Sequence, residues 1–179
     1  MKLWPGWLVV LAVACGGPQT APSTTTSNPA TPNPGTGSPE AIEPNGTIVR
    51  VVDGDTVDIR FGDIEERVRL IGIDTPETKK PDSPIECFGP EASTFTHDLL
   101  PTGTPVMVVR DVEARDDYGR LLGYVYRGSD GLFVNLELVA RGYASPLTIP
   151  PNVNFAVDFV QAARDAEAAD RGLWHSCAG

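Results

Sequence analysis

The chain has 179 residues, which is enough for one domain with a substantial core and not clearly enough for two. Hydrophobic residues make up 41% of the chain, which excludes a protein that is disordered throughout. The formal net charge of −10 excludes a protein that attracts polyanions through a broadly positive surface.

Residues 1–15 are typical of an export signal rather than of a folded domain. Lys2 precedes an apolar stretch over residues 3–14 that is too short for a comfortable membrane span. The stretch ends in LAVAC, which resembles a bacterial lipoprotein signal whose lipidated residue would be Cys15. Leu11 stands one position earlier than this pattern prefers, so an ordinary secretory signal cut nearby is the alternative. Both interpretations predict an exported protein, either lipid-anchored to the bacterial cell envelope or secreted.

Residues 16–44 are rich in Pro, Thr, Ser and Gly and contain no Lys or Arg. They show no apolar periodicity and cannot bury a core, so we expect a disordered tether. A flexible chain of this length would span on the order of 30 Å, and prolines would extend it further. The folded domain is then expected over residues 45–179.

Residues 46–74 and 105–126 predict five β-strands. β-Branched residues dominate GTIVRVV, VDIRF and ERVRLIGI, and the intervening DGDT and GDIE are hairpin-type turns. Two further runs, PVMVVRDVEA and LLGYVY, flank the turn RDDYGR. Five strands at hairpin spacing favour a small barrel over a parallel sheet.

Three helices are predicted around these strands. The first is GPEASTFTHDLL, with Pro90 at the helix start, and the second is VNLELVARGYA over residues 134–144. The third runs from about residue 154 to 170 and ends before Gly172, after which residues 173–174 form a hydrophobic plug. The fold class expected is therefore α+β, a five-stranded barrel with three α-helices.

Cys87 and Cys177 are the cysteines of the predicted domain. In an exported protein, two remaining cysteines most simply form a disulfide, and two separate thiols are the alternative. A bridge would close a loop of about 90 residues and contribute at most ~4–5 kcal/mol by the chain-entropy model.

Acidic residues gather near two predicted strand ends. Asp53 and Asp55 flank Gly54, and Asp74 closes the third strand. A hard cation such as Ca²⁺ prefers carboxylate, carbonyl and water oxygens, which these positions could provide. An Asp-Gly-Asp segment is also an ordinary turn, so the spacing alone leaves both interpretations open.

Two arginines and a glutamate accompany these acids. Arg69 lies inside an apolar strand, where a charge is costly unless it is paired or faces a cleft, and Arg120 follows the turn DDYG. Guanidinium groups bind phosphate oxygens through paired hydrogen bonds, although both arginines could equally be surface residues paired with acids. Glu77 follows Pro76 on a predicted loop, where it could accept a proton from water or simply be solvated.

The period of a strand constrains any common site. Arg69 and Asp74 are five positions apart, so a regular strand would place them on opposite faces. They can share a site only if the strand ends or bulges before Asp74, which the following Thr75-Pro76 favours.

Several motifs in a fixed order extend this interpretation. VVDGDTVDI, VRLIGIDTPET, FGPEAS, DDYGRLLGYVY, NLELVARGYA and RGLW closely resemble the staphylococcal-type thermonuclease family, over about residues 46–175. The resemblance implies an OB-fold barrel with three helices. It also implies a Ca²⁺-dependent phosphodiesterase that cleaves DNA and RNA and leaves 3′-phosphates, which we expect to be a monomer.

The resemblance assigns roles to matching positions. Asp55 and Asp74 would provide carboxylates to Ca²⁺, Thr75 would provide its backbone carbonyl, and Glu77 would be the candidate general base. The remaining residues would contact the substrate: Arg69 and Arg120 would bind the phosphate and stabilise charge in the transition state, and Tyr118 would lie beside a nucleotide phosphate.

Two departures from the family pattern concern substrate binding. The segment SPLTIPPN, residues 145–152, lacks the aromatic side chains on which a base would stack, and Asp117 replaces an expected basic residue. From residue 46 onward, 13 Lys and Arg face 22 Asp and Glu, a difference of −9. We therefore expect weak, salt-sensitive substrate binding that depends strongly on the metal.

Two other functions fit the same fold. One is a non-catalytic OB-fold module that only binds nucleic acid, and the other is a surface or adhesion domain in which Ca²⁺ is structural. Binding modules usually lack the catalytic arginine and glutamate positions, whereas Arg69, Glu77 and Arg120 are present here. This favours the enzyme.

Overall fold

The computed structural model describes residues 42–78 and 84–177. The predicted export signal, Cys15 and most of the predicted tether lie outside the described residues. Within these two ranges, every helix is too short or too polar to cross a membrane.

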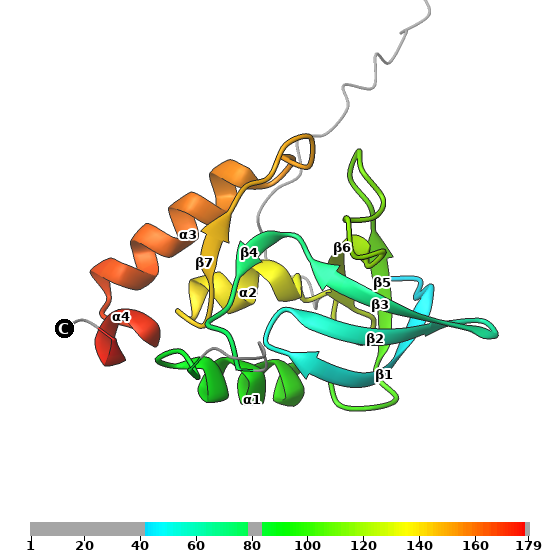
Figure 1. Cartoon of the computed structure of the whole chain (residues 1–179), viewed down its shortest axis with the longest axis horizontal. Helices are drawn as coiled ribbons and strands as arrows, with labels where there is room; N and C mark the ends of the chain where they lie inside the picture. Colours follow the sequence, from blue (N-terminus) through cyan, green and yellow to red (C-terminus); the bar gives the residue numbers. More distant parts are fainter. Residues whose placement is uncertain (1–41, 79–83, 178–179) are drawn as a thin grey trace, which may run out of the picture. The chain divides into compact units, whose positions relative to one another are not determined.

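Five strands form a closed barrel, as predicted (Figure 1). In chain order they are β1 (Gly46–Asp53), β2 (Thr56–Phe61), β3 (Ile64–Leu70), β5 (Pro105–Val109) and β6 (Leu121–Arg127). Around the barrel the order is β1-β2-β3-β6-β5. Neighbouring strands are antiparallel except β3 and β6, which run parallel. The topology therefore joins a three-stranded meander to a later hairpin.

The barrel closes because alternate residues of its strands are apolar and point inward. Val57, Ile59, Val68 and Leu70 on β2 and β3 are completely buried. Opposite faces of the same strands carry charged residues, so the outer surface of the meander is polar. The predicted turn DGDT joins β1 to β2, and GDIE joins β2 to β3. Both turns thus bring polar residues to the ends of the meander.

One predicted strand is divided in the structure, which corrects the expectation of a continuous strand over ERVRLIGI. β3 ends at Leu70, and β4 (Gly72–Asp74) pairs instead with β7 (Ser145–Leu147) in a separate two-stranded sheet. Gly72 has a φ of +81° at the break, and a Cβ there would lie 2.2 Å from the Phe159 ring. Glycine is therefore required both for the backbone conformation and for packing.

The three predicted helices are present (Figure 1). α1 (Gly89–Leu99) packs against β1, and α2 (Val134–Ala140) lies between β6 and α3 (Ala156–Ala168). A four-residue helix, α4 (Leu173–Ser176), was not predicted, and it carries the expected plug, since Trp174 packs against the core.

A disulfide joins Cys87 to Cys177, which confirms the predicted pairing. Cys87 precedes α1 and Cys177 follows α4, and 90 positions separate them in the sequence. The bridge therefore ties the loop before α1 to the C-terminal end of the described chain.

Candidate active site

A polar hollow of about 300 Å³ lies where the β1–β2 turn, the end of β3, β4 and the loop after β4 meet. The structure brings six predicted site residues together here: Asp55, Arg69, Asp74, Thr75, Glu77 and Arg120. Its lining also includes Asp53, which the sequence offered as a further oxygen donor, and Thr56 and Glu86, which had no predicted role. Residues distant in the sequence thus converge on one site.

Asp55 is the most firmly held carboxylate of the hollow. Its side chain is buried, and its Oδ2 accepts hydrogen bonds from the backbone N–H and Oγ1 of Thr75, each at 3.0 Å. Its Oδ1 accepts a bond from Oγ1 of Thr56 at 3.0 Å. Gly54 makes this packing possible, because a Cβ there would lie 2.6 Å from Thr75 Oγ1. One carboxylate therefore links the β1–β2 turn to the residue that follows β4.

Arg69 connects the two predicted metal carboxylates. Its Nη2 lies 2.8 Å from Oδ1 of Asp74 and 3.1 Å from Oδ2 of Asp55. Its Nη1 donates to the backbone carbonyls of Leu70 at 2.7 Å and Ile73 at 3.1 Å, and only 13% of the side chain is exposed. The strand is interrupted after Leu70, which places Arg69 and Asp74 on the same side. The geometric condition for a shared site is therefore met.

The charges of the hollow leave a negative excess. Burial raises the pKa of the Asp74 carboxyl above its ordinary value, Arg69 lowers it, and the nearby Asp55 and Glu86 carboxylates raise it further. A bound cation would favour the ionised form and oppose this shift. The local field therefore suits a positively charged ligand.

The donor set fits a hard cation in part. Asp55 and Asp74 offer carboxylate oxygens, which Ca²⁺ prefers. Both carboxylates contact Nη2 of Arg69, so their oxygens are close together. In the part of the chain that the structure describes, no three His, Cys, Asp or Glu side chains are grouped so that they alone could hold a metal. A cation here would thus need the Thr75 carbonyl and water in addition to the two aspartates.

Glu77 lies on a loop whose two ends are bonded together. Its backbone N–H donates to Oε2 of Glu86 at 3.0 Å, and the Glu86 N–H donates to the Glu77 carbonyl at 3.0 Å. The Thr78 N–H donates to Oε1 of Glu77 at 3.0 Å, and Thr78 Oγ1 donates to Oδ1 of Asp53 at 2.7 Å. Glu86 and Asp53 therefore position the loop that carries the candidate base.

Sequence reasoning missed these two supporting roles. Asp53 belongs to the DGD segment, so its position near the site could be inferred, but its bond to Thr78 could not. One feature of the sequence could have pointed to Glu86: it directly precedes Cys87, whose disulfide fixes that end of the loop.

Arg120 borders the hollow from the turn RDDYGR. Oδ2 of Asp116 accepts a bond from Arg120 Nε at 2.6 Å, and Oδ1 accepts from the backbone N–H groups of Tyr118 at 3.0 Å and Arg120 at 2.9 Å. Tyr118 lies outside the hollow and is 86% exposed, and its ring centroid is 5.5 Å from the guanidinium carbon of Arg120. Asp116 thus fixes the turn that carries both residues.

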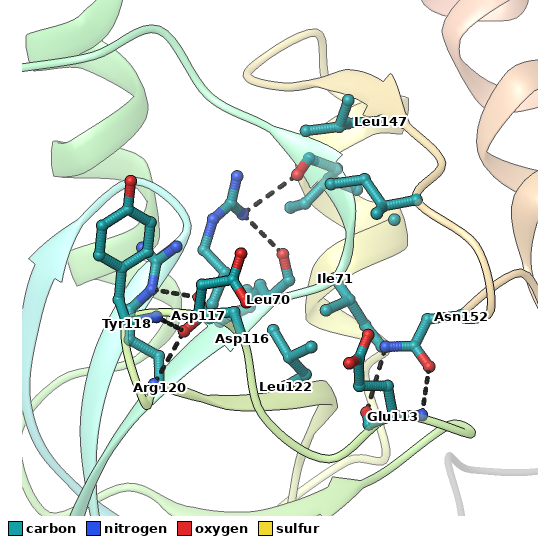
Figure 2. Close-up of a pocket in the computed structure, with 14 residues that line it drawn as sticks. Leu70, Ile71, Glu113, Asp116, Asp117, Tyr118, Arg120, Leu122, Leu147 and Asn152 are labelled. Atoms are coloured by element: carbon teal, nitrogen blue, oxygen red, sulfur yellow. Dashed lines mark hydrogen bonds and ion pairs between the residues drawn. The ribbon is translucent and has the colours of Figure 1, made fainter.

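A second pocket of about 330 Å³ adjoins this turn (Figure 2). Tyr118 and Arg120 lie at one side of it, and Leu147 and Asn152 lie at the other. Ile149 also lines the pocket, so aliphatic side chains stand in the segment where aromatic residues were expected from the family pattern. Among the described residues, Tyr118 is the aromatic side chain that lines this pocket.

Comparisons with known proteins show which family the sequence matches. Residues 67–176 match the family model for staphylococcal nuclease homologues. The chain is 42% identical over 127 residues to the thermonuclease of Staphylococcus intermedius, which covers 71% of this chain and 74% of that protein. It is 35% identical over 138 residues to the thermonuclease of Staphylococcus hyicus, covering 77% and 80% of the two chains. It is also 34% identical over 131 residues to endonuclease YncB of Bacillus subtilis, covering 73% and 61%.

Proposed function

The chain belongs to the staphylococcal nuclease family and is a nuclease, and we propose that it is a Ca²⁺-dependent enzyme that hydrolyses DNA and RNA to leave 3′-phosphate ends. The observation that carries this proposal is the single hollow shared by Asp55, Asp74, Arg69, Arg120 and Glu77. It combines paired acids, paired arginines and a separate carboxylate, the groups that phosphodiester hydrolysis needs.

In the proposed site, Asp55 and Asp74 provide carboxylates and Thr75 its carbonyl to Ca²⁺. Bound there, Ca²⁺ supplies a Lewis acid and a template for the substrate phosphate. Asp55 can perform this role without rearrangement, because Thr75 and Thr56 already hold its carboxylate. Asp74 is more exposed and completes the site from β4.

Arg69 and Arg120 then bind the phosphodiester. Both line the hollow, and a guanidinium offers parallel N–H donors to two phosphate oxygens while keeping its charge. Negative charge on those oxygens increases as water attacks phosphorus, and donors fixed in advance stabilise that charge most effectively. The bond from Nε of Arg120 to Asp116 holds that guanidinium in place for phosphate. Arg69 would stay held through Nη1 and would turn Nη2 to the phosphate once a cation takes its place at Asp55 and Asp74.

Glu77 is the proposed general base. Its carboxylate accepts a proton from water, the water oxygen attacks phosphorus in line, and the bond from phosphorus to the 5′-oxygen breaks. The leaving oxygen takes a proton from solvent, which gives a 5′-hydroxyl and a 3′-phosphate. Glu86 and Thr78 set the position of Glu77 through bonds to its backbone and carboxylate.

We also propose that the nuclease acts outside the cytoplasm as a monomer, lipid-anchored through Cys15. The signal-like residues 1–15 and the disulfide both support export. A Cys15→Ser variant should lose palmitate incorporation in labelled cells and appear in a soluble fraction. Equal labelling of the variant and the natural chain would contradict the anchor.

The activity is tested by incubating the full chain with plasmid DNA and with RNA, in Ca²⁺ and in chelator. Cleavage should require Ca²⁺, and Glu77→Gln should lower kcat by about 10²–10⁴-fold. Arg120→Ala should lower it by about 10²–10³-fold. Glu91→Gln, a glutamate of α1 outside the hollow, is the matched control and should cleave normally. Absence of Ca²⁺-dependent cleavage would instead support a non-catalytic binding module.

A further inference from the structure

A second group of charged residues lies on the outer face of the barrel, and we name it the Arg50–Asp58–Arg67 cluster. Arg50 contacts Oδ2 of Asp58 through Nε and Nη2, each at 2.7 Å. Arg67 donates from Nε to Oδ1 at 2.8 Å and from Nη2 to Oδ2 at 3.2 Å. One carboxylate is thus shared by two guanidinium groups, which leaves a local charge excess of one positive unit.

The two arginines are held in place but remain accessible. The Asp58 side chain is only 5% exposed, whereas those of Arg50 and Arg67 are 61% and 46% exposed. Asp58 is the only partner of either arginine among the described residues. A buried acid therefore orders two guanidinium groups whose remaining N–H donors face solvent, so little side-chain entropy is left to lose when an anion binds.

The neighbouring acids do not cancel this excess. A pocket of about 540 Å³ over the cluster is also lined by Glu65 and Glu66. Glu66 is paired with Arg115 at 2.7 Å, and Glu65 lies 3.7 Å from Arg60. Each glutamate thus has an arginine of its own.

The cluster adjoins the candidate active site. Its pocket shares Arg120 with the polar hollow, and Tyr118 lies at the boundary with Arg120. On β3, Arg67 and Arg69 are two positions apart and therefore on the same face, at a spacing of about 7 Å. That spacing is comparable with the separation of successive phosphates along an extended nucleic-acid strand.

From this arrangement, and resting on the proposed nuclease function, we propose that the Arg50–Asp58–Arg67 cluster binds a second phosphate of the polynucleotide beside the one being cleaved. Tyr118, which lines the pocket over the cluster, offers an exposed ring on which a base next to the second phosphate can stack. This contact would let an otherwise acidic protein bind a polyanion at one position. It would also offset the loss of stacking side chains at Leu147 and Ile149.

The test compares substrates that have or lack a second phosphate. We would measure kcat and KM of the full chain on a single-stranded oligonucleotide and on a dinucleoside monophosphate, which has a single phosphodiester. The variants are Arg50→Gln and Arg67→Gln, each of which leaves one arginine on Asp58, so the fold should persist in thermal melts. Arg164→Gln is the matched control, an exposed arginine of α3 that does not line the pocket.

We expect Arg50→Gln and Arg67→Gln to raise KM for the oligonucleotide about fivefold to tenfold with little change in kcat. KM for the dinucleoside monophosphate should not change, and the salt dependence of oligonucleotide binding should decrease by about one phosphate contact. Unchanged KM values, equal increases on both substrates, or an equal effect of Arg164→Gln would overturn the inference. If the natural chain cleaves neither substrate, the proposed function itself fails, which is a different outcome.

Discussion

Two charged clusters on the same barrel contain carboxylates and guanidinium groups in opposite ratios. In the hollow, the carboxylates of Asp55 and Asp74 share the guanidinium of Arg69. On the outer face, the guanidinium groups of Arg50 and Arg67 share the carboxylate of Asp58. The first cluster has a negative excess and suits a cation, and the second has a positive excess and suits a phosphate. Local stoichiometry, rather than a net charge of −10, therefore indicates which ligand each position can bind.

The pKa values of one aspartate from each cluster are shifted in opposite directions. Burial raises the pKa of Asp74, and the nearby acids raise it further. Hydrogen bonds from Arg67 and Arg50 lower the pKa of Asp58, although burial alone would raise it. The pKa values of two carboxylates less than twenty positions apart thus shift in opposite directions: burial is the largest cause at Asp74, whereas the hydrogen bond from Arg67 outweighs burial at Asp58.

Removing one arginine from each cluster should separate their roles most clearly. We expect Arg69→Gln to lower kcat by about 10³-fold or more, because it deletes donors to the transition-state phosphate. Ca²⁺ binding should persist, since both carboxylates remain and lose a competing cation. Arg67→Gln should leave kcat nearly unchanged. Single-turnover cleavage at saturating Ca²⁺ measures the difference, and similar losses in the two variants would contradict the division of roles.

The clusters also differ in how they are supported. The outer cluster stands on barrel strands, whereas the hollow depends on the Glu77 loop, which the Cys87–Cys177 disulfide fixes near Glu86. Replacing both cysteines by serine should lower the free energy of unfolding by up to about 4 kcal/mol. It should also reduce kcat more than it raises KM.

Urea unfolding and steady-state cleavage measure these two effects. The natural chain treated with a reductant is the control and should behave like the double variant. An unchanged unfolding midpoint would show that the bridge contributes little, and an unchanged kcat would show that it does not position Glu77.

Asp58 gives the smallest effect and a defined pH dependence. Its folded pKa lies below the unfolded value of about 3.9, so its stabilising contribution is present above that pH and disappears as the pH falls through the folded value. Asp58→Asn should therefore cost about 1–3 kcal/mol at neutral pH. The difference from the natural chain should shrink in acid. Urea unfolding at several pH values measures this, and a difference independent of pH would contradict the role of the Asp58 charge.

Much of the fold could be predicted because its signals are local. Alternating β-branched residues, the turns DGDT and GDIE, and helical periodicity are all visible within short stretches. β4 and β7 were missed because their pairing depends on the break at Gly72 and its contact with Phe159, which are distant in sequence. The helix α4 was missed because four residues give too short a pattern.

The site, like the fold, could be predicted only where its signals lie within short stretches of sequence. Family motifs identify Asp55, Arg69 and Glu77, but they do not reveal that Glu86 bonds to Glu77. The outer cluster escaped prediction because it depends on register, which places Asp58 opposite both Arg50 on β1 and Arg67 on β3. Such cross-strand contacts follow from pairing and not from any one segment.

Calcium binding tests the central claim most directly, because it measures the negative excess of the hollow without catalysis. We would titrate Ca²⁺ calorimetrically into the natural chain, Asp74→Asn and Asp58→Asn. We predict one site in the natural chain, an affinity at least about tenfold lower in Asp74→Asn, and an unchanged affinity in Asp58→Asn. Equal affinities in all three proteins, or a loss confined to Asp58→Asn, would show that the cation does not bind between Asp55 and Asp74.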